Sequence, residues 1–149
     1  MTTDELDRQV RLSVYRHLVG TGQAPTLRDT SVDVGLDSTD ISASLERLDA
    51  SHALVLHPTT RELWMAMPFS AIPTGFRVTS AEHAWWANCA WDALGISAML
   101  QIPAEIRTSC ACCGDSLTVR TTGRALRDVS GVVHFAVPAA AWWEDIGFT

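Results

Sequence analysis

The spacing of apolar residues predicts three short helices in the first third of the chain. Apolar side chains recur at near-helical intervals over 5–19, and glycines follow as a stop signal. The stretch 25–36 contains Thr26 and Asp29 three residues apart, the outline of a helix cap, and Gly35 near its end. The polar run 37–40 predicts the cap of a third helix, which continues with apolar residues at a helical repeat.

A β-hairpin is expected after these helices. Apolar segments over 53–57 and 62–67 flank a turn-like Pro-Thr-Thr-Arg stretch. Three helices and a hairpin in this order form the winged-helix pattern, so we predict a winged-helix-like N-terminal domain over 1–67. The polar face of its third helix carries one basic residue, Arg47, and two acidic residues, Asp40 and Glu46. Such a face is a poor surface for phosphate contacts. A structural or docking role is therefore favoured over DNA binding.

The second half of the chain mixes strand-like and helix-like segments. Pro68 and Pro73 bracket an extended connector, where we place a domain boundary. We expect a core domain over 68–149 and an α+β fold class for the whole chain. The expected elements are strands over 76–78, 105–109, 116–120 and 131–137, a helix that starts at 79–82 and carries residues 85–94, a helical turn over 139–146, and the beginning of a strand over 147–149.

Size and charge narrow the function classes. A chain of 149 residues can form one domain or two small ones that share a core. The net charge of −6 argues against a free-standing nucleic-acid binder, although all eleven basic residues are arginine. No apolar run reaches membrane-spanning length, and the acidic N-terminus is unlike a signal peptide. We therefore expect a cytoplasmic protein with no membrane and no nucleic-acid partner.

The stretch 85–94 contains the candidate chemistry. Cys89 and Asp92 lie three residues apart in a segment that we predict as helix, which would place both on one face. A soft sulfur beside a carboxylate can hold a soft metal and move a proton. Trp85, Trp86 and Trp91 surround the pair and indicate a thiol shielded from water. Judged by residue type alone, a cysteine or tryptophan in such a segment more often packs in the core than reacts or contacts a ligand.

The other three cysteines follow the strand predicted over 105–109. Cys110 and Cys113 form a Cys-x-x-Cys pair with Cys112 between them, which is half of a zinc knuckle. The second half is absent, and His134 is a lone histidine on an apolar segment, so zinc is less favoured than a buried Cys110 with neighbours on a turn. Structural disulfides are not expected in a reducing compartment.

Several of these segments, in this order, resemble the organomercurial or alkylmercury lyases (MerB-like proteins). The residues that carry the resemblance are the aromatic-flanked Cys89-Ala90-Trp91-Asp92, the position of Cys110, the apolar segment 132–138 and the segment 68–78. The resemblance implies a winged-helix-like N-terminal domain followed by a mixed α/β lyase-like core. It also implies cleavage of carbon–mercury bonds by protonolysis to a hydrocarbon and Hg(II).

The resemblance assigns roles by position. Cys89 would be the thiolate that binds mercury, Asp92 would carry the proton to carbon and help to hold Hg(II), and the three tryptophans would form apolar pocket walls. Family members have a second catalytic cysteine directly after an aromatic residue, and here Thr149 follows Phe148. Two alternatives follow. Either Cys110, Cys112 or Cys113 substitutes for that cysteine, with Cys110 and Cys113 as candidate metal ligands, or the core is truncated at its C-terminus and full lyase activity is not expected.

Two hypotheses follow from the sequence. The first is an alkylmercury lyase with an organomercurial substrate, no required cofactor and a mercuric reductase as acceptor of the bound product, Hg(II). The second is a non-catalytic winged-helix protein of the transcriptional-regulator type that senses a soft metal or thiol through its cysteines.

Overall fold

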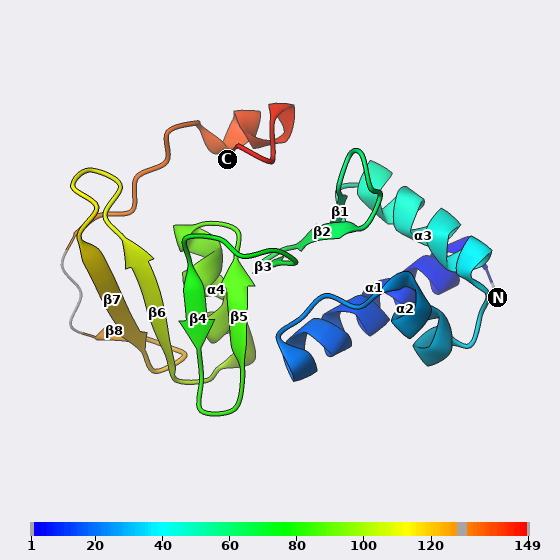
Figure 1. Cartoon of the computed structure of the whole chain (residues 1–149), viewed down its shortest axis with the longest axis horizontal. Helices are drawn as coiled ribbons and strands as arrows, with labels where there is room; N and C mark the ends of the chain where they lie inside the picture. The colour runs from blue at the N-terminus through cyan, green and yellow to red at the C-terminus, as the bar shows by residue number, and fades with distance from the viewer. Residues whose placement is uncertain (1, 128–130, 149) are drawn as a thin grey trace.

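The computed structural model of the protein describes residues 2–127 and 131–148, and its first part consists of three packed helices (Figure 1). They are α1 (Thr3–Thr21), α2 (Leu27–Val34) and α3 (Ser38–Ala50). Thr26 and Asp29 form a reciprocal capping box at the start of α2, and Asp37 caps α3. The three predicted helices are therefore confirmed, and so is the capping pattern that indicated the second.

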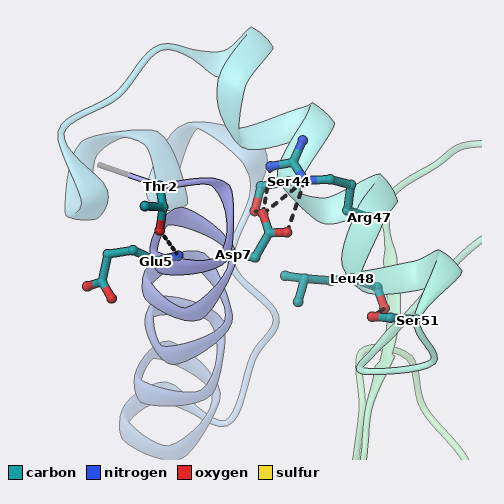
Figure 2. A network of polar contacts seen from close by, with 7 residues as sticks. All are labelled: Thr2, Glu5, Asp7, Ser44, Arg47, Leu48 and Ser51. Carbon is teal, nitrogen blue, oxygen red and sulfur yellow. Dashed lines mark hydrogen bonds and ion pairs between the residues drawn. The ribbon is translucent and has the colours of Figure 1, made fainter.

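A partly buried polar network joins α1 to α3 (Figure 2). The carboxylate of Asp7 accepts hydrogen bonds from Ser44 Oγ at 2.6 Å and from Arg47 Nη2 at 2.6 Å. The guanidinium of Arg47 holds the pKa of the Asp7 carboxyl below its usual range. Arg47, the basic residue on the polar face of α3, therefore forms an ion pair with Asp7 within the fold.

One antiparallel sheet of eight strands forms the rest of the framework, in the order β1-β2-β3-β5-β4-β6-β7-β8. Every neighbouring pair is antiparallel. The strands are β1 (Val55–Leu56), β2 (Leu63–Ala66), β3 (Phe69–Ser70), β4 (Arg77–Thr79), β5 (Ala84–Ala87), β6 (Ala104–Ser109), β7 (Ser116–Thr121) and β8 (Leu126–Arg127). The α+β class is confirmed, as are the hairpin after α3 and the β6–β7 pair.

The sheet is continuous across the boundary that we predicted. The connector after Pro68 is strand β3, which pairs with β2 on one side and β5 on the other. The hydroxyl of Tyr15 donates to the carbonyl of Met67 at 2.8 Å, and the indole N–H of Trp85 donates to the carbonyl of Leu18 at 2.8 Å. The division into domains 1–67 and 68–149 and the winged-helix-like geometry both stay predictions.

Helix α4 (Ala90–Leu100) packs on one face of the sheet and contacts β4, β5 and β6 (Figure 1). Ala93 and Ile96 are fully buried and join a core that includes Phe69 and Trp85. The helix continues through Gly95. None of the described helices is both long enough and apolar enough to cross a membrane.

The helix predicted to start at 79–82 is wrong, because this segment is the turn of the β4–β5 hairpin. The side chain of Ser80 accepts hydrogen bonds from the backbone N–H groups of Glu82 and His83 at 3.3 and 3.1 Å. A serine followed by an acidic residue makes this turn as readily as it caps a helix. The next four residues form β5, in which Trp85 and Ala87 face the core and alternate with half-buried neighbours.

The C-terminal segment also differs from the prediction. Residues 131–137 form no strand, and Val132 is 94% exposed. The sheet order contains no strand from this segment, because strand-forming residues alone do not supply a paired neighbour. The helical turn expected after Pro138 is confirmed as the 3-10 helix η1 (Ala139–Glu144). Gly147 and Phe148 lie in a turn instead of a strand, and Thr149 lies outside the described residues.

Candidate functional site

A cavity of about 390 Å³ lies where the sheet, the start of α4 and the C-terminal segment meet. Its volume is in the range of small-molecule sites. Most of its lining is apolar or aromatic. The lining residues are Trp64, Met65, Ser70, Ile72, Thr74, Phe76, Asn88, Cys89, Ala90, His134, Phe135, Ala136, Val137, Trp142, Ile146, Gly147 and Phe148.

Cys89 is the N-cap of α4 and lines this cavity. Its extended backbone (φ −147°) turns the chain from β5 into the helix, and its Sγ accepts a hydrogen bond from the backbone N–H of Asp92 at 3.5 Å. The two residues are close in space, as predicted, but for another reason. They are related as N-cap and third helical residue, and Cys89 lies just outside the helix whose face we expected it to share.

Asn88 holds the carboxylate of Asp92. Its side-chain amide donates to Asp92 Oδ2 at 3.1 Å and to the carbonyl oxygen of Phe69 at 3.2 Å, so it ties the carboxylate to strand β3. The Oδ1 atom of Asn88 is buried and has no hydrogen-bond partner among the described residues. Sequence reasoning missed Asn88, because an asparagine four residues before an aspartate is no signal on its own.

Both acidic groups of the site hold their protons more tightly than usual. Burial raises the pKa of the Cys89 thiol; the N–H of Asp92 opposes this rise, and the Asp92 carboxylate adds to it. Burial also raises the pKa of the Asp92 carboxyl, against hydrogen bonds from Asn88 and Cys89 that favour its charged form. The thiol and the carboxyl are thus neighbouring proton carriers whose pKa values are both raised by burial.

The three tryptophans that we predicted as pocket walls lie outside the lining of this cavity. Trp85 is 2% exposed and points toward α1. Trp86 stacks against the guanidinium of Arg77, whose carbon lies 4.4 Å from the ring centroid. Trp91 is 62% exposed on the first turn of α4. Their contact with a substrate stays a prediction.

Two other tryptophans, Trp64 of β2 and Trp142 of η1, supply the aromatic wall. The C-terminal segment that contributes Trp142 is anchored by its neighbour Trp143, whose ring stacks on His52 with centroids 3.8 Å apart. Sequence reasoning missed both wall residues. Trp64 belongs to the predicted hairpin and Trp142 to the predicted helical turn over 139–146, and neither is close to Cys89 along the chain. His134, the lone histidine on an apolar segment, is exposed and lines the cavity.

Cys110, Cys112 and Cys113 lie on the β6–β7 turn and are absent from the cavity lining. The backbone N–H groups of Cys113 and Cys112 lower the pKa of the Cys110 thiol. The N–H of Asp115 favours the thiolate of Cys113, but hydrogen bonds to the Asp115 carboxylate and to Cys110 raise its pKa overall. Among the described residues, no three His, Cys, Asp or Glu side chains gather as a metal site.

A family model and a solved structure both match this chain. The family model MerB, described as alkylmercury lyase, matches residues 69–149, which include Asn88, Cys89 and Asp92. The crystal structure of the mercury-bound form of MerB2 superposes with a TM-score of 0.59 at 21% sequence identity. The match covers 84% of this chain and 66% of that one, so this chain spans just under two thirds of its length. No curated protein matches.

Proposed function

The chain belongs to the alkylmercury lyase family, and on that basis we propose that it binds organomercurial compounds and cleaves their carbon–mercury bond to give a hydrocarbon and Hg(II). One observation carries the proposal. A thiol and a carboxyl group, both with a raised pKa, meet at the first turn of α4, and the thiol opens onto an apolar cavity. The reaction as proposed needs no resident cofactor.

The proposed reaction begins with transfer of the Cys89 proton to the Asp92 carboxylate. The Cys89 thiolate then bonds to the mercury of the substrate, and its electron density strengthens the carbanion character of the attached carbon. The protonated Asp92 gives its proton to that carbon, the carbon–mercury bond breaks, and its electron pair stays with the hydrocarbon. Hg(II) remains on the sulfur, with the regenerated carboxylate as a second ligand.

We assign Asn88 as the positioning residue for Asp92. Its amide fixes the carboxylate at 3.1 Å and is itself fixed to strand β3, so the proton donor needs no rearrangement before the reaction. The apolar and aromatic wall of the cavity suits an alkyl or aryl group on mercury.

A second sulfur is part of the expectation from the family resemblance. In this sequence Thr149 follows Phe148, which lines the cavity. We therefore propose that a small thiol from solution supplies the second sulfur on mercury and that turnover depends on it. We also propose a mercuric reductase as a final acceptor of Hg(II), and a scaffolding role for the three N-terminal helices as a winged-helix-like unit.

The regulatory alternative is not favoured. A DNA-reading α3 would need free basic groups, and the guanidinium of Arg47 donates to the carboxylate of Asp7. The shallow surface along this helix is lined by Ser38, Thr39, Ser42, Ala43 and Glu46, with no basic residue.

Benzene release from phenylmercury tests the proposed function. The purified protein is incubated with phenylmercury acetate, with and without an excess of a small monothiol, and benzene is measured by gas chromatography. We expect release that requires the monothiol, a loss of at least a hundredfold in Cys89→Ser and Asp92→Ala, and a smaller loss in Asn88→Ala.

Cys112→Ser is the matched control, because Cys112 is an exposed thiol on the β6–β7 turn and outside the cavity. It should release benzene at the rate of the unaltered protein. Folded protein that releases no benzene, or undiminished release by Cys89→Ser, would contradict the proposal.

A further inference from the structure

Two groups of thiols lie at the same end of the sheet. Strand β4 is antiparallel to both β5 and β6, so β5 and β6 run in the same direction and end at the same edge. Cys89 follows closely after β5 and Cys110 directly after β6. With one strand between them, β5 and β6 lie about 10 Å apart. Figure 1 shows the β6–β7 turn and the start of α4 at this common edge.

The β6–β7 turn brings two of its thiols together. The backbone N–H of Gly114 donates to the carbonyl of Cys110 at 2.8 Å, and the N–H of Cys110 donates to the carbonyl of Asp115 at 2.8 Å. The left-handed conformation of Gly114 (φ 78°) closes the turn. Cys110 begins this turn and Cys113 directly precedes Gly114, so both thiols belong to one closed turn. Two thiols at Cys-x-x-Cys spacing on such a turn can bind one metal ion.

The surroundings of this pair indicate which ion it can take. Cys110 is half-buried and Cys113 exposed, and among the described residues no three His, Cys, Asp or Glu side chains gather around one metal position here. Zinc takes four ligands in structural sites, so two thiolates leave it incomplete. A soft ion that accepts two thiolates, such as Hg(II), needs nothing more from the protein.

We propose that Cys110 and Cys113 form a second Hg(II) site, which receives the ion from Cys89 and presents it to solvent. The transfer is a ligand exchange without oxidation or reduction. The Cys110 thiolate bonds to the Hg(II) held by Cys89, the Cys113 sulfur follows, and the Cys89–mercury bond breaks. The proton of Cys113 moves to the departing Cys89 sulfur, so charge and atoms balance. The source of Hg(II) rests on the proposed function, whereas binding at the second site does not.

Binding of inorganic Hg(II) tests the second site without any lyase activity. The Cys89→Ser protein is mixed with one equivalent of mercuric chloride in excess small monothiol, and bound mercury is followed by native mass spectrometry and thiolate–mercury ultraviolet absorption. We expect one retained Hg(II). Cys89→Ser/Cys113→Ser should bind it at least tenfold more weakly, whereas the matched Cys89→Ser/Cys112→Ser should retain it. Circular dichroism verifies that each variant is folded.

Two results would overturn the second site. They are equal retention by Cys89→Ser/Cys113→Ser and an equally large loss in Cys89→Ser/Cys112→Ser. Transfer is tested by locating the bound mercury ion after benzene release. We expect it on Cys110 and Cys113 in the unaltered protein and on Cys89 in the Cys113→Ser variant. Mercury that stays on Cys89 in the unaltered protein would refute transfer. An absence of benzene would refute the lyase function and leave the mercuric chloride result unaffected.

Discussion

Cys89 has two roles that make different demands on one atom. As the N-cap of α4 it must accept a backbone N–H, and its sulfur does so at 3.5 Å. Sulfur is a weak acceptor, whereas the oxygen of serine or threonine is the usual capping atom. A thiol at this position therefore weakens the start of the helix while it provides a nucleophile. The proposed chemistry explains why a weaker cap is present there.

Cys89→Ser should separate these two roles. We expect loss of benzene release together with a free energy of unfolding that is unchanged or higher by about 0.5 kcal/mol, because serine is a good N-cap. Urea denaturation followed by circular dichroism measures the second quantity. A clearly less stable variant would show that the sulfur has a packing role beyond capping.

The raised pKa of Asp92 predicts how stability depends on pH. A carboxyl group whose pKa is higher in the folded state stabilises that state below its unfolded value, near 3.9, and this contribution is lost as the pH rises through the folded value. Asp92→Asn removes the effect. Its stability relative to the unaltered protein should therefore increase from acidic to neutral pH.

Urea titrations at a series of pH values measure this difference. Asp33→Asn, which removes an exposed carboxylate on α2, controls for the lost charge. If the difference in the free energy of unfolding between the Asp92→Asn and unaltered proteins stays constant with pH, burial does not raise the pKa of Asp92.

At the scale of elements, local signals determined which predictions succeeded. The helices α1, α2 and α3 each carry their own cap and an apolar repeat, so a short window of sequence specifies them. The β4–β5 hairpin was missed because Ser80 serves a turn as well as a cap. The segment 131–137 has strand-forming residues, but a strand also needs a free neighbouring edge, which a single sequence does not reveal. Cys89 and Asp92 could be identified from their spacing, whereas Asn88, Trp64 and Trp142 meet them only through tertiary structure.

The contact between the C-terminal turn and β2 should control the shape of the cavity. A Cβ atom at Gly147 would lie 2.5 Å from Cη2 of Trp64, so the indole or the turn must move in Gly147→Ala. We expect a loss of about 1–3 kcal/mol in stability from overpacking and a higher KM for phenylmercury, because both residues line the cavity.

Gly20→Ala is the matched control for this change. A Cβ at Gly20 meets nothing within 4 Å on the exposed side of α1, and alanine is the better helix former. This variant should keep the original KM and gain slightly in stability. An unaltered KM in Gly147→Ala would mean that the turn does not shape the substrate site.

At the scale of the whole molecule, the three N-terminal helices are tied to the sheet at more than one place. Besides the β2–β3 pairing, which continues the sheet across the predicted domain boundary, α1 itself contacts the sheet. The last turn of α1 contacts the start of β5, where a Cβ at Gly22 would collide with the carbonyl oxygen of Ala84. Together with the hydrogen bond from Trp85 to Leu18, this contact fixes the helical part against the strand that leads to Cys89. We therefore expect the chain to unfold as one unit.

Two glycine variants test this coupling. Gly22 and Gly35 both end helices in the left-handed conformation, so alanine incurs the same backbone strain at each, of order 1 kcal/mol. Only Gly22→Ala also meets the Ala84 backbone. We expect it to destabilise the protein clearly more than Gly35→Ala and to lower benzene release. Equal effects in calorimetry and activity would show that the contact between α1 and β5 is unimportant.

The placement of the tryptophans gives the protein a built-in optical signal. Trp64 and Trp142 line the cavity with Cys89, whereas the ring of Trp85 is buried against α1. A heavy atom such as mercury quenches the fluorescence of an indole that lies close to it. Binding at Cys89 should therefore dim part of the emission, and Trp64→Phe should reduce this change. The departure of the ion to another site would then appear as recovery of fluorescence, so that the path of the metal through the molecule can be followed in real time.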